Sequence, residues 1–170
     1  MKKPILAILM CLISMNYCYS QLIHSKGINS LGLSCGIGSK SIIPGLSFQH
    51  YFNSVARLSL NLKYEPINFT FSDYKSFQFN PEFAFTLSKV SKNFYLNAIG
   101  GVSFGFEYAD NKIYSEKKTN IFFGENFGIS TEYYISNKIK IELFLEQFLF
   151  QHSIDLHADY YIGITVSKQL

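Results

Sequence analysis

Bulky apolar side chains occupy every second position over long stretches of the chain that begin near residue 27. The segment 55–65 is the clearest example. One face carries Ala56, Leu58, Leu60, Leu62 and Tyr64, and the other carries Arg57, Ser59, Asn61, Lys63 and Glu65. A period of two is typical of β-strands with one apolar and one polar face, and no long stretch follows the helical period of about 3.6.

Eight such segments follow one another along the chain. We expect strands at residues 28–38, 44–53, 54–71, 77–88, 94–108, 120–135, 139–150 and 156–168. Three connections, 53–54, 89–93 and 136–138, are short and polar, whereas 109–119 is long and charged. Outer-membrane barrels have an even number of antiparallel strands, with short turns on one side and longer loops on the other. The sequence therefore predicts an all-β fold, an eight-stranded antiparallel up-and-down transmembrane β-barrel.

The first twenty residues have a different character. A basic start at 1–4 precedes an apolar run over 5–15 and a more polar stretch that ends in a small residue. These features indicate a secretory signal peptide, cleaved between Ser20 and Gln21. We therefore divide the chain into a signal peptide (1–20) and a barrel domain (21–170). Two alternatives are weaker, because the apolar run is too short for a membrane anchor and no small residue directly precedes Cys18, as a lipoprotein would require.

Composition narrows the class of protein further. Aromatic residues make up 17% and charged residues 16% of the chain, yet the mean hydropathy is only +0.09. A bundle of membrane helices is excluded, because each helix needs about 20 consecutive apolar residues. Without the signal peptide the chain has 13 Lys and Arg against 12 Asp and Glu and lacks a basic cluster, so we expect no direct nucleic-acid binding. Cys35 would be the only cysteine left, which excludes an internal disulfide.

Side-chain volume decides which strand face points inward. An eight-stranded barrel has room inside only for packed side chains or one small ligand. The apolar faces carry too many bulky groups for this space. The polar faces carry many small residues, including Gly32, Ser34, Gly36, Ser59, Gly101, Ser103, Gly105, Gly124, Gly128, Ser130, Gly163 and Thr165. We therefore expect the small polar face inside and the Phe, Leu and Ile face outside, against the lipid of a bacterial outer membrane.

This orientation directs a set of charged side chains into the barrel lumen. They are Arg57, Lys63, Glu65, Glu82, Glu107, Glu132, Lys140, Glu142, Glu146 and Asp159. Buried ions need partners, and this set contains both signs. We expect a salt-bridged plug that leaves no wide pore.

Two residues fit the outward face poorly, namely Glu125 and His50. Charge is unfavourable at mid-depth on a lipid-facing surface, so we expect a β-bulge near Gly124 or a position at the membrane interface. Five tyrosines near the expected short-turn ends suit an interfacial girdle. They are Tyr51, Tyr64, Tyr95, Tyr133 and Tyr134.

The candidates for chemistry are few. His152, Asp155, His157 and Asp159 form the one local cluster that resembles a metal site, but a polar loop entering a strand explains them as well. The sequence lacks a G-x-S-x-G elbow, and its glycine pairs precede no helix, as a phosphate loop would require. We expect no enzymatic activity, no cofactor and no resident metal, and we identify no small-molecule substrate. The segment 112–119 is either a partner-binding loop or a solvated tip.

A series of glycines, aromatic residues and charges runs through the C-terminal part of the chain. It comprises 100–107, Phe123, Gly124, Gly128, Glu132, Tyr133, Tyr134, 140–150, His157, Gly163 and Ile164, and 26–28 adds to it at the first strand. In these residues the chain resembles the TraO family of conjugal transfer proteins of Bacteroides-type conjugative transposons, mainly over residues 94–170. The resemblance implies an outer-membrane component of a conjugative, type IV secretion-like apparatus, with other transfer-apparatus proteins as partners. The alternative is a generic barrel similar to OmpX or OmpW, in adhesion, envelope maintenance or small-molecule passage.

The outward orientation of the apolar face gives the first prediction. The chain without residues 1–20 should fold only in detergent or lipid, and its folded form should migrate differently from its boiled form on a gel. A folded monomer in plain buffer would show that the apolar face points inward instead.

Overall fold

The structure is a computed structural model that describes residues 26–68, 72–111, 116–154 and 158–170. The expected signal peptide and its cleavage site lie outside the described residues. In the part of the chain that the structure describes, no helix is long and apolar enough to cross a membrane.

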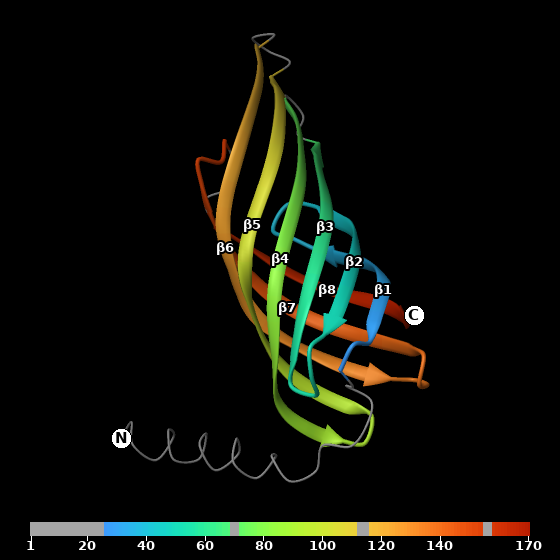
Figure 1. The fold of residues 1–170 in the computed structure, drawn as a ribbon. Helices are drawn as coiled ribbons and strands as arrows, with labels where there is room; N and C mark the ends of the chain where they lie inside the picture. Colours follow the sequence, from blue (N-terminus) through green and yellow to red (C-terminus); the bar gives the residue numbers. More distant parts are fainter. Residues whose placement is uncertain (1–25, 69–71, 112–115, 155–157) are drawn as a thin grey trace, which may run out of the picture.

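Eight antiparallel strands form a closed barrel in which each strand pairs with its neighbours in sequence and β8 pairs with β1 (Figure 1). The strands are β1 (Asn29–Ile37), β2 (Ile42–Tyr51), β3 (Ala56–Asn68), β4 (Ser72–Ser91), β5 (Phe94–Asn111), β6 (Glu116–Tyr134), β7 (Ile139–Gln151) and β8 (Ala158–Gln169). The predicted fold class and strand number are confirmed. We call the end with the turns at 52–55, 92–93 and 135–138 the short-turn end, and the opposite end the long-hairpin end.

The central strands are longer than the sequence pattern predicts. Part of the segment 109–119, expected to be a loop, continues the strands: 109–111 belong to β5 and 116–119 to β6, with Ala109 opposite Lys118 and Asp110 opposite Lys117. β4 likewise begins at Ser72 rather than at residue 77. Backbone pairing continues where the outer face is no longer uniformly apolar, and an alternation of outward apolar and inward polar residues cannot reveal such a continuation. As a result, β3 to β6 rise above the other strands at the long-hairpin end (Figure 1).

Side chains on the outer surface form rows that follow the strand register across β3 to β6. The last apolar row is Tyr64, Phe77, Phe106 and Ile121, which we call the aromatic row. The next row toward the long-hairpin end is Pro66, Lys75, Tyr108 and Thr119, the Lys75 row. Beyond it lie Asp73, Asp110 and Lys117. The outer surface therefore changes from apolar to charged within two rows, as at the edge of a lipid-facing band.

The interior is less uniformly small and polar than expected. Phe122, Phe144, Phe148, Phe150 and Tyr161 point inward and belong to one buried cluster. They share strand faces with inward polar residues, but both their size and their apolar character depart from the expected small polar interior. Large rings fill space that the small residues elsewhere on the inner surface leave open.

Gly100 and Gly101 provide a matched pair for testing backbone packing. A Cβ at Gly101 would lie 2.3 Å from the carbonyl oxygen of Pro81, whereas one at Gly100 would have its nearest neighbour at 4.0 Å. We expect Gly101→Ala to lower the free energy of unfolding by about 1–3 kcal/mol, because a backbone atom must move. Gly100→Ala should change it by less than about 1 kcal/mol. Urea titration in micelles, read by gel migration, measures both, and equal effects would contradict this packing.

Candidate functional site

The structure places all ten charged residues expected in the lumen inside the barrel, each at most 6% exposed. They come from β3 to β8 and comprise three cationic and seven acidic side chains. The structure does not gather them into one network. They form two ion-paired groups and several carboxylates held by neutral donors.

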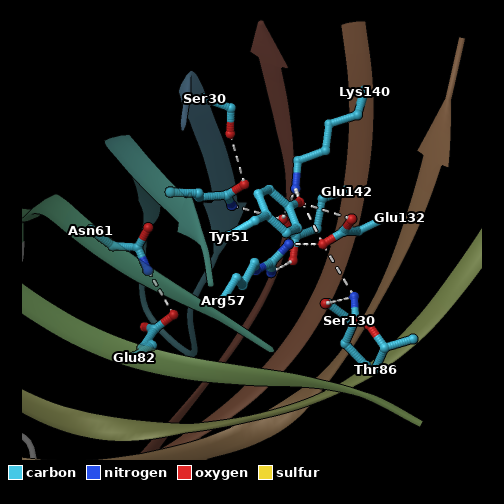
Figure 2. A network of polar contacts seen from close by, with 12 residues as sticks. Ser30, Tyr51, Arg57, Asn61, Glu82, Thr86, Ser130, Glu132, Lys140 and Glu142 are labelled. Carbon is cyan, nitrogen blue, oxygen red and sulfur yellow. Dashed lines mark hydrogen bonds and ion pairs between the residues drawn. The ribbon is translucent and has the colours of Figure 1, made fainter. Parts of the chain in front are cut away.

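Arg57 is the centre of the larger ion-paired group, near the short-turn end (Figure 2). Its guanidinium contacts Glu132 on β6 and Glu142 on β7. Lys140 lies 3.1 Å from Glu132 Oε1 and 3.5 Å from Glu142 Oε2. Two cations thus face two carboxylates in a space closed to solvent, which is the pairing that buried charges require.

Two tyrosines complete this group. Lys140 Nζ donates to the Tyr51 hydroxyl at 2.6 Å, and Tyr51 in turn donates to Glu132 at 3.1 Å. The Tyr134 hydroxyl lies 3.1 Å from that of Tyr51 and donates to Glu132 at 3.2 Å. These hydrogen bonds add partners for Lys140 Nζ and for the Glu132 carboxylate beyond their ion pairs.

The expected tyrosine girdle is therefore wrong for most of its members. Tyr51, Tyr95 and Tyr134 point inward and are at most 4% exposed. Tyr64 pairs with Phe77 in the aromatic row, far from the short-turn end. Only Tyr133, which is 50% exposed, stays as a candidate for the interface at that end. Strand parity could have revealed the inward set, since Tyr134 shares a face with Glu132.

The second group surrounds Lys63. Its ammonium lies 2.7 Å from Glu146 Oε2. It also lies 4.3 Å from the ring centroid of Tyr161 and 4.6 Å from that of Phe148. One carboxylate and two aromatic rings thus compensate the buried ammonium through a salt bridge and cation–π attraction.

Other carboxylates accept hydrogen bonds from neutral groups. Glu82 accepts from the amides of Asn61 and Asn126 at 2.6 and 2.9 Å. Glu65 accepts from Ser41 and Gln78 at 3.1 and 3.3 Å.

Toward the long-hairpin end, the segment after β7 folds over Glu107. Glu107 accepts from Tyr74 at 2.6 Å, from Ser153 at 2.9 Å and from the backbone N–H of Ile154 at 2.5 Å. Asn120 adds a fourth donor at 2.9 Å. Asp159 on β8 accepts from the backbone N–H of Ser39 at 3.1 Å. These carboxylates hold connecting segments across the barrel mouth.

Little free space separates the two ion-paired groups. A cavity of about 20 Å³ lies between them and is lined by residues of both, among them Arg57, Lys63, Glu82 and Glu146. A space of this size holds about one water molecule. The barrel interior at this level is filled by side chains.

Glu125 and His50 have different environments on the outer surface. The register is continuous through Glu125, which pairs with Val102 and Leu149, so the bulge expected near Gly124 is absent. Glu125 is exposed between Phe123 and Phe127. The Nδ1 atom of His50 lies 2.7 Å from Asn29 Oδ1 at the start of β1, which places His50 at the short-turn end.

The structure describes only two of the four residues in the candidate metal cluster, His152 and Asp159. Asp155 and His157 lie outside the described residues. His152 is exposed with its ring 5.5 Å from that of Phe123, and Asp159 accepts backbone hydrogen bonds. In residues 26–68, 72–111, 116–154 and 158–170, no three His, Cys, Asp or Glu side chains are placed to hold a metal ion.

Comparisons with known proteins identify the class of fold but assign the chain to no family. No family model matches the chain, and no curated protein matches its sequence. The N-terminal β-barrel domain of Pseudomonas aeruginosa OprF aligns with a TM-score of 0.69 at 9% identity, covering 85% of this chain and 98% of that domain. Neisserial surface protein A aligns at 0.62 and 10% identity, covering 84% and 96% of the two chains. Ail, the attachment invasion locus protein of Yersinia pestis, aligns at 0.56 and 11% identity, covering 85% and 98%.

These similarities define the class of fold. It is that of the small outer-membrane β-barrels, with eight antiparallel strands and no further domain in the described residues. The identities of 9–11% carry no further property from these proteins to this chain. The resemblance to the TraO family receives no support from the comparisons.

Removal of Arg57 tests the larger ion-paired group. Arg57→Ala leaves Glu132 and Glu142 buried with only Lys140 as a cation, so we expect a loss of about 3–5 kcal/mol in the free energy of unfolding. Glu125→Gln is the control, because this carboxylate is exposed on the outer surface, and its effect should stay within about 0.5 kcal/mol. Urea midpoints in detergent compare the two variants. An Arg57→Ala protein as stable as the wild type would show that the group contributes nothing to folding.

Proposed function

We propose that this protein is a non-enzymatic barrel of the bacterial outer membrane that anchors an extracellular interaction surface. The apolar outer face and the similarity in fold to outer-membrane barrels support the location. An N-terminal signal peptide, as the sequence predicts, would direct export. The proposal includes no cofactor, no small-molecule substrate and no direct contact with nucleic acid.

The filled interior favours an anchor over a channel. The Arg57 group joins β3, β6 and β7 across the lumen, and the cavity beside it measures only about 20 Å³. Passage of a solute would require these buried ion pairs to separate, which is costly. Small-molecule passage is therefore the weakest of the generic barrel roles for this chain.

The observation that carries the proposal is the unequal length of the strands. β4, β5 and β6 have 18 to 20 residues, whereas β1, β2, β7 and β8 have 9 to 13. A membrane-spanning strand needs only about 9–11 residues. The excess on the central strands forms a sheet beyond the aromatic row, bearing Lys75, Tyr108 and Lys117 on its outer face. A rigid polar sheet outside the membrane is suited to contact with a macromolecular partner, as in adhesion.

Conjugative transfer is the second candidate function. It rests on the resemblance of residues 94–170 to the TraO family, a range that contains β5 and β6 of the projecting sheet. In this case the partners would be other proteins of the transfer apparatus. Genes for conjugation proteins beside this gene would favour this candidate, and an isolated gene would favour a generic barrel.

Cell-surface labelling tests the orientation of the barrel. In a Cys35→Ser background, Thr119→Cys should react with a membrane-impermeant maleimide on intact cells. Ser136→Cys, in the turn between β6 and β7, should react only after the outer membrane is opened. The reverse pattern would place the projecting sheet in the periplasm and exclude adhesion.

Substitutions on the projecting sheet test its role in contact. Tyr108→Ala combined with Lys117→Ala should reduce attachment of producing cells, or cross-linking to transfer proteins in donor cells, by about tenfold, because contact energy concentrates in a few side chains. Lys138→Ala, in a short turn, is the control and should have no effect. Unchanged attachment and unchanged cross-linking, with wild-type levels of folded protein, would refute a role for this surface.

A further inference from the structure

A large apolar groove lies on the outside of the barrel, over β2 to β6. It measures about 820 Å³, a size typical of sites for extended small ligands. Its walls include Leu46, Leu62, Tyr64, Phe77, Phe104 and Phe106. The groove is thus a hollow in the lipid-facing surface, and parts of the inward-facing residues Lys63 and Gln78 also line it.

The groove lies where two strands stop pairing. The pairing of β2 with β3 ends at Gly45 and Lys63, although β2 begins at Ile42 and β3 continues to Asn68. Pro44 and Pro66 lie in these two segments, and neither has a backbone N–H to donate to a neighbouring strand. The hollow therefore lies where the β2–β3 ladder ends, and a proline follows that end on each of the two strands.

The groove also lies at a defined level in the membrane, at the edge of the apolar band. Tyr64, Phe77, Phe106 and Ile121 of the aromatic row all line it, and this row is the last apolar one before the Lys75 row. The ring centroids of Tyr64 and Phe77 are 4.7 Å apart, and the two rings form one wall of the groove. A lipid with its acyl chains in the groove would have its headgroup at the level of Lys75.

Lys75 is the cation closest to the groove along β4. It is exposed, two residues from Phe77 on the same face, and has no hydrogen bond or ion pair within the described residues. The acidic groups of the next row include Asp110, which accepts a hydrogen bond from Tyr108 at 3.1 Å and lies opposite Lys117 in the strand register. Asp73, also in that row, has its own partner. The ammonium of Lys75 is therefore available to a negative group above the groove.

We propose that the groove binds a lipid with a negatively charged phosphate headgroup, with its acyl chains against the aromatic row and its phosphate on Lys75. The apolar lining selects for acyl chains, and the free ammonium selects for the charge of the headgroup. This site shares Lys75 with the outer face of the projecting sheet, but it requires only the membrane and the barrel, so its test needs no macromolecular partner.

Lipid retention by the purified protein tests this site. The full chain, processed by its host and extracted in detergent, is mixed with phosphatidylglycerol or phosphatidylcholine of identical acyl chains, and bound lipid is counted by native mass spectrometry. The wild type should retain phosphatidylglycerol about fivefold better than phosphatidylcholine, and Lys75→Gln should abolish this preference. Leu62→Trp, which fills the groove from an exposed apolar position, should reduce retention of both lipids.

Lys138→Gln is the matched control, because it removes an exposed lysine at the opposite end of the barrel. It should retain lipid as the wild type does, and gel migration verifies that every variant is folded. Equal retention of the two lipids by the wild type, or the same loss in Lys75→Gln and Lys138→Gln, would overturn the site. A dimer that excludes lipid and is lost in Leu62→Trp would assign the groove to a second copy instead.

Discussion

The contact of Arg57 with Glu132 and Glu142 is the interaction on which the interior depends. It joins β3 to β6 and β7 across the lumen, so it links strands that have no shared ladder. Backbone pairing closes the barrel wall but leaves its centre to be filled. A charge inside the barrel needs an opposite charge or hydrogen-bond donors beside it, and the guanidinium contacts two carboxylates at once. Lys140, Tyr51 and Tyr134 then occupy the sites that remain around the same carboxylates.

The sequence pattern predicts the fold and the side of the wall on which each charge lies. Alternation with a period of two is sufficient for both, since one correct assignment of faces fixes every residue on a strand. It cannot predict which charges meet. Arg57 and Glu142 are 85 residues apart and approach only across the closed barrel, at positions set by the stagger of all strands between them. For the same reason Lys63 could not be matched in advance with Glu146 and the ring of Tyr161.

The places where the structure differs from the sequence pattern have related physical causes. Residues 109–111 and 116–119 of the expected loop extend β5 and β6, because outside the membrane the outer face need not be apolar and the alternation is lost while the ladder continues. Tyr51 and Tyr134 lie near the short-turn end but on the inward face, so their position along the strand alone predicts the wrong environment. Glu125 breaks the rule on the outer face without a bulge, and nothing among the described contacts explains it.

Strand length and interior filling together indicate a division of labour within the barrel. The buried ions and the surrounding wall make a stable, closed anchor, and the additional residues of β4 to β6 make a sheet that the anchor holds outside the membrane (Figure 1). The same asymmetry creates the outer groove, since β3 continues past the point where β2 can pair with it. A cylinder of eight equal strands would offer neither a projecting sheet nor a hollow below it. The uneven strands are therefore the feature of this barrel that separates it most clearly from a simple membrane plug.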